Sequence, residues 1–203
     1  VDDGMVVSFN QDGIDDVAEL METIVASMDF ASAIPPTEFD CLLGAPCKIY
    51  VSSAKVQPQE GGGPAAEMEL DLIDGGMAVE MDLYNFRLET ALEIPNPLGS
   101  LIPIPGLPST LTSDVALTWE HIQLNMNVYI SMVDGEAVVN AEPLETQLDM
   151  GPAPTIELID GVPELDSVID GVLAITVPII HAAVEVAIPF AASELMQGLV
   201  GGL

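Results

Sequence analysis

Residues 171–192 have the sequence GVLAITVPIIHAAVEVAIPFAA, which is apolar on nearly every side of a helix. A stretch of this kind approaches the ~20 residues needed to span a membrane. It also contains two prolines, one histidine and Glu185, and an ionised carboxylate at mid-bilayer costs at least about 2.5 kcal/mol. We therefore predict a long C-terminal helix over residues 160–200 that is buried in its own protein. A membrane anchor is the alternative.

A second helix is predicted near the start of the chain, over residues 10–31. Asn10 or Asp12 can cap it, and the acidic residues that follow suit a helix N-terminus. Its apolar residues recur with the spacing of one buried helical stripe, at Ile14, Val17, Leu20, Met21, Ile24, Val25 and Met28.

Between the two helices the apolar residues recur at every second position, which is typical of half-buried strands. In residues 67–72, for example, acidic and apolar residues alternate strictly as EMELDL. We predict strands within 47–94 and within 114–150, with a hairpin turn at Asp74-Gly75-Gly76. The alternation slips by one residue at Glu120-His121, where we predict a β-bulge.

Residues 95–110 contain five prolines. Because proline cannot donate to a strand ladder, we predict a crossover or edge segment there. The whole pattern predicts an α+β fold with a half-buried antiparallel sheet that has one apolar face and one acidic face.

Charge excludes several functions. The chain has 203 residues, with 33 Asp+Glu against 3 Lys+Arg, and its net charge is −30. Three cations cannot neutralise a row of phosphates, so the sequence argues against nucleic-acid binding and against attachment to an anionic membrane. Such a charge suits a saline or cation-rich setting, marine or halophilic, because salt screens the self-repulsion. Simple solubility is the alternative explanation.

Cys41 and Cys47 are the two cysteines. They bracket a short loop of turn-forming residues, so a disulfide between them is sterically feasible. Two free buried thiols are the alternative. A paired cysteine in a chain with no others favours an oxidising compartment, so we expect a secreted, periplasmic or cell-surface attached protein.

Catalytic and metal-binding patterns are missing from the sequence. It has no nucleophile elbow, zinc-binding helix motif or phosphate loop, and we expect His121 and His181 to be hydrogen-bonded core residues. We therefore predict no enzyme activity and no cofactor. Asn10, Asp12, Asp15 and Asp16 partly resemble a Ca²⁺ loop but lack its full ligand set, so we expect weak, diffuse Ca²⁺ binding at most and no specific metal site.

The order of the elements resembles the tubular lipid-binding superfamily, which includes bactericidal/permeability-increasing protein and the takeout-like proteins. The resemblance covers about residues 6–203 and rests on element order, with residues 169–203 in the place of the closing helix. It implies a single domain over residues 1–203, in which a long, strongly twisted antiparallel sheet wraps around the amphipathic N-terminal helix and the apolar C-terminal helix. It also implies a non-enzymatic carrier or transfer protein for an acyl-chain or sterol-like lipid held in an apolar tunnel. Transient membrane contact would accompany such transfer. The resemblance does not imply that this chain binds lipopolysaccharide, because the family members that bind it do so with cationic surfaces that this chain lacks.

Composition fits such a tunnel. The chain has ten methionines and only 4% aromatic residues, and methionine suits surfaces that accommodate varied apolar partners. A closed, dry core in an acidic extracellular interaction protein without a lipid ligand is the alternative. We predict that the tunnel is lined by Val17, Met21, Ile24, Val25, Met28, Met68, Leu70, Val79, Met81, Leu83, Leu117, Trp119, Leu124, Met126, Val128, Ile130, Ile169, Val172, Leu173, Ile180, Val184 and Ile188.

Overall fold

The computed structural model describes residues 11–42, 45–95, 110–133, 136–141, 146–160 and 166–201. They form two α-helices, α1 (Gln11–Ser27) and α3 (Asp166–Gly201), and a short 3₁₀ helix, η1 (Phe30–Ala33). Eight strands complete the fold: β1 (Thr37–Leu42), β2 (Ala45–Lys55), β3 (Ala66–Ile73), β4 (Gly76–Pro95), β5 (Thr110–Val133), β6 (Glu136–Ala141), β7 (Gln147–Asp149) and β8 (Thr155–Asp160). The α+β class with a large antiparallel sheet is therefore confirmed.

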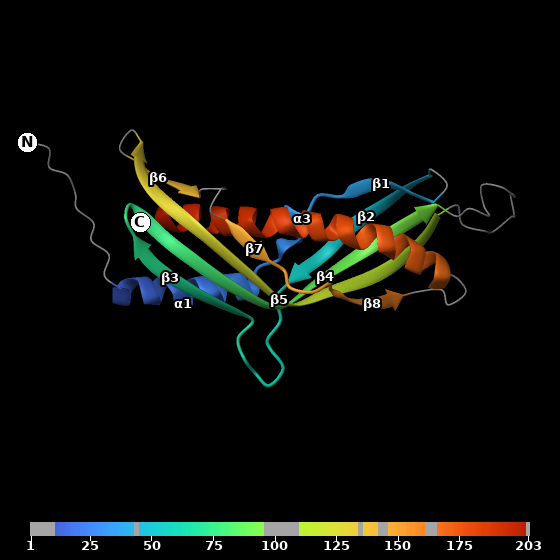
Figure 1. Cartoon of the computed structure of the whole chain (residues 1–203), viewed down its shortest axis with the longest axis horizontal. Helices are drawn as coiled ribbons and strands as arrows, with labels where there is room; N and C mark the ends of the chain where they lie inside the picture. Colours follow the sequence, from blue (N-terminus) through green and yellow to red (C-terminus); the bar gives the residue numbers. More distant parts are fainter. Residues whose placement is uncertain are drawn as a thin grey trace, which may run out of the picture.

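All strand pairs in the described sheet are antiparallel, and two long central strands organise them (Figure 1). β4 has 20 residues and β5 has 24, and they pair along nearly their whole length. The shorter strands add to the outer edges of this pair: β2 and β3 pair with β4, and β6, β7 and β8 pair with β5. β1 extends the sheet beyond β2.

Several predicted boundaries are wrong. The N-terminal helix ends at Ser27 and not at residue 31, because Asp29 has an extended backbone and caps the separate helix η1. β1 and β8 were not predicted as strands. The C-terminal helix was predicted from residue 160, yet Asp160 belongs to β8 and α3 begins at Asp166. The predicted crossover lies almost wholly outside the described residues.

The predicted β-bulge is also wrong. The phase does slip on β5, where Glu120 and His121 are both exposed, but β4 slips at the same level, between Tyr84 and Asn85. The register is therefore the same on both sides of the slip, with Tyr84 opposite His121 and Phe86 opposite Trp119. Asn85 has a φ of 46°, a left-handed conformation that asparagine tolerates better than most residues. On both long strands the alternation of buried and exposed side chains thus shifts by one residue at the same level. Neither strand therefore has an extra residue in the ladder.

The helices lie on the apolar side of the sheet. α1 packs against β3, and α3 runs along the sheet with contacts to β6, η1 and β1 (Figure 1). The opposite side of β3 carries exposed acids that alternate with buried Ala66, Met68 and Leu70. One contiguous cluster of buried residues joins α1, η1, the sheet and α3.

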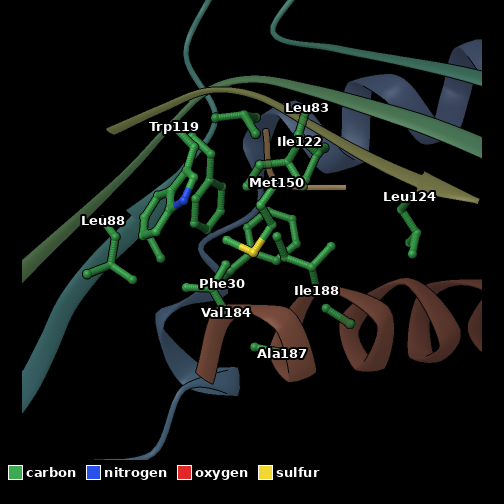
Figure 2. Packing of buried hydrophobic residues seen from close by; sticks show 14 of the residues in the cluster. Phe30, Leu83, Leu88, Trp119, Ile122, Leu124, Met150, Val184, Ala187 and Ile188 are labelled. Atoms are coloured by element: carbon green, nitrogen blue, oxygen red, sulfur yellow. The ribbon is translucent and has the colours of Figure 1, made fainter. Parts of the chain in front are cut away.

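Aromatic rings occupy the middle of this cluster (Figure 2). Phe86 meets Phe30 edge-on at 5.7 Å between ring centroids, and Trp119 lies 6.0 Å from Phe86. Val184 and Ile188 of α3 are fully buried close to them. The kink between Tyr84 and Phe86 therefore lies beside the aromatic part of the core.

Helix α3 continues through Pro178 and Pro189. Its segment Gly171–Gly198 is long and apolar enough to cross a membrane by length and composition alone, and 39% of its most apolar stretch is buried in the protein. Val172, Val184 and Ile188 are buried, whereas Val186 and Phe190 are exposed. The helix is therefore less completely buried than the sequence led us to expect.

Asp29 fastens the end of α1 to the sheet. Its Oδ1 accepts hydrogen bonds from the N–H groups of Ala31 (3.1 Å) and Ala54 (2.9 Å), and Lys55 Nζ lies 3.5 Å from Oδ2. Burial alone would raise the pKa of Asp29, but these two N–H groups and the ammonium outweigh it and lower the pKa below its ordinary value.

Replacing Asp29 should make stability depend less on pH. We expect Asp29→Ala to lose about 1 kcal/mol at neutral pH, as for other helix caps. Because the folded pKa is lowered, the ionised side chain stabilises the fold above its ordinary pKa of 3.8, and this contribution disappears as the pH falls through the folded value. Urea unfolding at several pH values should therefore show the gap to wild type narrowing below about pH 3.8. Asp29→Asn, which caps without ionising, is the control. A gap that widens in acid would contradict the assignment.

The turn between β3 and β4 requires a glycine at one position. A Cβ on Gly76 would lie 2.1 Å from the carbonyl oxygen of Val128 and 3.0 Å from Cα of Tyr129, both backbone atoms of β5. We expect Gly76→Ala to destabilise the protein by about 1–3 kcal/mol because β5 must shift. Gly171→Ala in α3 is the control, since its Cβ meets nothing within 4 Å and alanine favours a helix by up to about 1 kcal/mol. Equal urea midpoints for the two variants would contradict this account.

Candidate functional site

An apolar groove of about 540 Å³ opens between β8 and the first half of α3. Its volume lies in the range of ligand sites, about 300–1,000 Å³. It is lined by Ala153, Pro154, Ile156, Leu158, Leu173, Ala174, Val177 and Pro178. We call it the α3–β8 groove; none of these lining residues carries a charge.

The register of β8 explains why its apolar residues line the groove. Ile156 pairs with Leu117 and Leu158 pairs with Val115, and both β5 residues are fully buried. Ile156 and Leu158 therefore extend the core face of the sheet past its last covered strand. They remain 44% and 38% exposed, because α3 stands away from them and leaves the groove.

The opposite face of β8 is tied down by an ion pair. Arg87 Nη1 of β4 contacts Glu157 Oε2 at 2.8 Å, and Arg87 Nε contacts Glu89 Oε1 at 3.1 Å. The hydrogen bonds to Glu157 and then to Glu89 raise the pKa of Arg87 above its ordinary value. This side-chain bridge crosses β5 and holds β8 against the sheet on the side away from the groove.

A second apolar groove, of about 360 Å³, lies between α1 and the end of α3. It is lined by Met21, Ile24, Met28, Glu194, Leu195 and Gly198. The two grooves lie at residues 173–178 and 194–198 of the same helix, so at 1.5 Å per residue about 30 Å separates them along α3.

Most residues predicted to line a tunnel lie in the buried core cluster. Val17 and Met28 are half-buried against it and Ile24 is at its exposed edge, while the side chains of Ile130 and Ile169 lie outside the described ones. Met21, Ile24 and Met28 line the second groove, and Leu173 lines the α3–β8 groove. The other members are buried: Val25, Met68, Leu70, Val79, Met81, Leu83, Leu117, Trp119, Leu124, Met126, Val128, Val172, Ile180, Val184 and Ile188. A tunnel-lining role for this set stays a prediction.

The sequence prediction missed the β8 side of the groove. Ile156 and Leu158 alternate with Thr155, Glu157 and Ile159, which is the strand pattern used elsewhere in the chain. Prolines at 152 and 154 and a helix expected from residue 160 concealed it. The alternation alone was a sufficient signal for the strand, but the groove depends on how α3 packs.

Polar residues cluster away from the grooves, at the kink of the long strands. His121 stacks on Tyr84 and its Nε2 lies 2.5 Å from Asp82 Oδ1, while its side chain is 48% exposed. The hydrogen bond from Tyr84 to Glu67, 2.7 Å long, raises the pKa of Tyr84 to about 12. His121 is therefore a surface residue and not the core histidine that we expected.

His181 lies in α3 and is half-buried, with its ring 6.2 Å from that of Trp119. Within the described part of the chain, no group of three or more His, Cys, Asp and Glu is placed to hold a metal ion. The Ca²⁺-loop resemblance begins at Asn10, outside the described residues.

No protein-family model matches the sequence, and no curated protein matches it either. Among solved structures, the fold is similar to that of a lipopolysaccharide binding protein, with a TM-score of 0.52 and 11% sequence identity. The match covers 93% of this chain and 38% of the other, so this chain spans well under half of that protein's length. At this identity the likeness shows the fold, and at that level it supports the resemblance seen in the sequence.

The acidic surface predicts a dependence of stability on salt. Each of the three cations contacts an acid: Lys48 approaches Glu38 at 4.0 Å, Lys55 approaches Asp29, and Arg87 bridges two glutamates. The remaining carboxylates repel one another, and salt screens that repulsion. We expect the melting temperature to rise between low salt and 1 M NaCl, with KCl as the control for ion-specific effects. A melting temperature that is flat over this range would contradict the expectation.

Proposed function

We propose that this protein is a non-enzymatic carrier that binds a lipid in the α3–β8 groove. The observation that carries the proposal is the groove itself: it is uncharged, continuous with the core face of the sheet, and lined by half-exposed aliphatic side chains. Covering such side chains with an acyl chain releases roughly 0.8 kcal/mol per buried CH₂. The similarity in fold to a protein named for binding lipopolysaccharide adds support.

The ligand is expected to differ from a multiply anionic lipid. Phosphate groups need cations, and Lys48, Lys55 and Arg87 already contact carboxylates. Bringing an anionic head group to a surface of net charge −30 would add repulsion. A neutral or zwitterionic lipid fits the chain better, and so does transient contact with a membrane of the same kind.

A more detailed form of this proposal is that the ligand occupies an apolar tunnel inside the protein. Most of the predicted lining residues are buried in the core, and a chain longer than the α3–β8 groove would have to displace some of them along α3. Methionine and aliphatic side chains repack more readily than aromatic ones. We propose that long ligands extend in this direction, toward the groove formed with Met21 and Met28.

A secreted, periplasmic or cell-surface location also stays a proposal. Cys47 is buried in β2, opposite Phe39 of β1 in the ladder, and Cys41 lies two residues farther along β1. The Cys41 side chain is outside the described ones, so the disulfide stays a prediction. Its formation would place the protein in an oxidising compartment.

Neighbouring residues of β8 provide a matched pair of variants. Leu158 lines the groove, whereas Ile159, at a register irregularity of β8, is 46% exposed and does not line it. We expect Leu158→Glu to reduce uptake of a fluorescent fatty alcohol at least tenfold, because a carboxylate in the groove opposes an alkyl chain. Ile159→Glu should retain wild-type uptake. Native mass spectrometry of the purified wild-type protein should find lipid bound.

Recovery of the wild-type protein without lipid, together with no uptake of the fluorescent alcohol or of a fatty acid, would refute lipid binding. That result would favour an acidic interaction protein with a solid core. Equal uptake by both variants would refute this groove as the site and would direct attention to the second groove.

A further inference from the structure

One buried polar group in the core has no partner. Trp119 is 1% exposed, and its indole Nε1 finds no hydrogen-bond acceptor among the described residues. Buried N–H groups are nearly always paired with protein or with water. The side chain points from β5 toward α3 among Phe30, Leu88 and Val184 (Figure 2). A hydrogen-bond acceptor on a bound molecule would pair with this N–H group.

Trp119 is buried next to His181, one helical turn beyond the lining of the α3–β8 groove. Its neighbour Thr118 is the last β5 residue that pairs with β8, opposite Thr155, and Pro154, which precedes Thr155, lines the groove. On the helix side, Pro178 also lines the groove, and His181 follows one turn later with its ring against that of Trp119. Trp119 is therefore adjacent to residues that flank the groove on both sides, on β8 and on α3.

The surroundings of Trp119 determine what kind of acceptor fits. Its near neighbours are the hydrocarbon rings and side chains of the core, together with His181. A neutral histidine offers one donor and one acceptor, but His181 does not accept a hydrogen bond from Trp119 Nε1. The chain's three cations contact carboxylates of β1, β4 and β8 and that of Asp29, the N-cap of η1. A carboxylate taken into this place would be desolvated without a positive partner, which is unfavourable. A neutral oxygen needs one N–H only.

We propose that the α3–β8 groove takes a neutral long-chain molecule with its polar end innermost. A hydroxyl or carbonyl oxygen of the ligand accepts a hydrogen bond from Trp119 Nε1, and the alkyl chain runs outward between β8 and α3, past Ile156 and Leu158. The ligand class is thus that of long-chain alcohols, esters or sterol-like molecules with one neutral oxygen. This inference rests on the proposed function, and it reverses the usual orientation, in which the head group stays at the opening.

Trp119 is the sole tryptophan, so its fluorescence in the wild-type protein reports on this place alone. We suggest loading the protein with long-chain methyl esters that carry bromine, a contact quencher, near the ester end or near the methyl end. The ester-end bromine should cause the larger loss of fluorescence. Equal losses, or a larger loss from the methyl-end bromine, would overturn the proposed orientation while leaving lipid binding intact.

A variant tests the hydrogen bond itself. Trp119→Phe removes the N–H and keeps a ring in the core. Its affinity for a long-chain alcohol should fall about five- to tenfold, the value of one neutral hydrogen bond, while its affinity for an alkane of equal length stays unchanged. Because the comparison is made within one variant, a general loosening of the core would lower both affinities equally. That equal loss would overturn the proposal and would mean that water, or nothing, meets the N–H.

Ligand charge gives a third comparison on the wild-type protein. At neutral pH a long-chain alcohol should bind more tightly than the fatty acid of the same length. Tighter binding of the fatty acid would overturn the proposal of a neutral ligand. If neither ligand binds, the proposed function fails as well, so the two failures are distinguishable.

Discussion

The ladder between β4 and β5 is the constraint on which the rest of the structure depends. It keeps one register from the Gly76 end to the Pro95 end, and the other strands of the described sheet attach to it directly or through β2. Because the register is constant, a shift in which residues of one strand point into the core requires the same shift on the other strand. Asn85 makes the match possible with its left-handed backbone. The apolar face before the kink covers α1, and the face after it carries the aromatic cluster and the β8 edge.

This constraint also explains what the sequence could and could not predict. The spacing of Ile14, Val17 and Met21 indicated α1, and the strict alternation around Met68 and Leu70 indicated β3 with its acidic outer face. Both patterns are local, so one segment is sufficient to detect them. The shift of the alternation at Glu120-His121 was visible in the sequence too, but its structural cause was not. A slip on one strand alone implies a bulge, and only the ladder shows that Tyr84-Asn85 slips opposite it.

The candidate site was harder to predict for the same reason. Buried residues such as Leu117 and Val184 are recognisable by their type and spacing, and they were assigned to a lining. A groove, however, is space that side chains do not fill, and it depends on how far α3 stands from β8. Ile156 and Leu158 were available in the sequence as an alternating pair, yet nothing local marked them as uncovered. Trp119 was assigned to the lining because it shares the strand phase of Val115 and Leu117, whereas the unpaired Nε1 is a property of its surroundings.

The separation of charge from apolar surface restricts the function further. Acidic residues occupy the outer face of β3 and the side of β8 that Arg87 anchors, and the residues that line the α3–β8 groove are uncharged. A ligand in that groove is therefore close to a low-dielectric core and surrounded, farther out, by negative charge. Both factors act against an anionic head group: desolvation at the inner end and repulsion at the outer end. A neutral molecule avoids both penalties, and a single buried N–H then contributes to selecting it, because in an apolar channel one directional donor distinguishes molecules that carry an acceptor from those that do not.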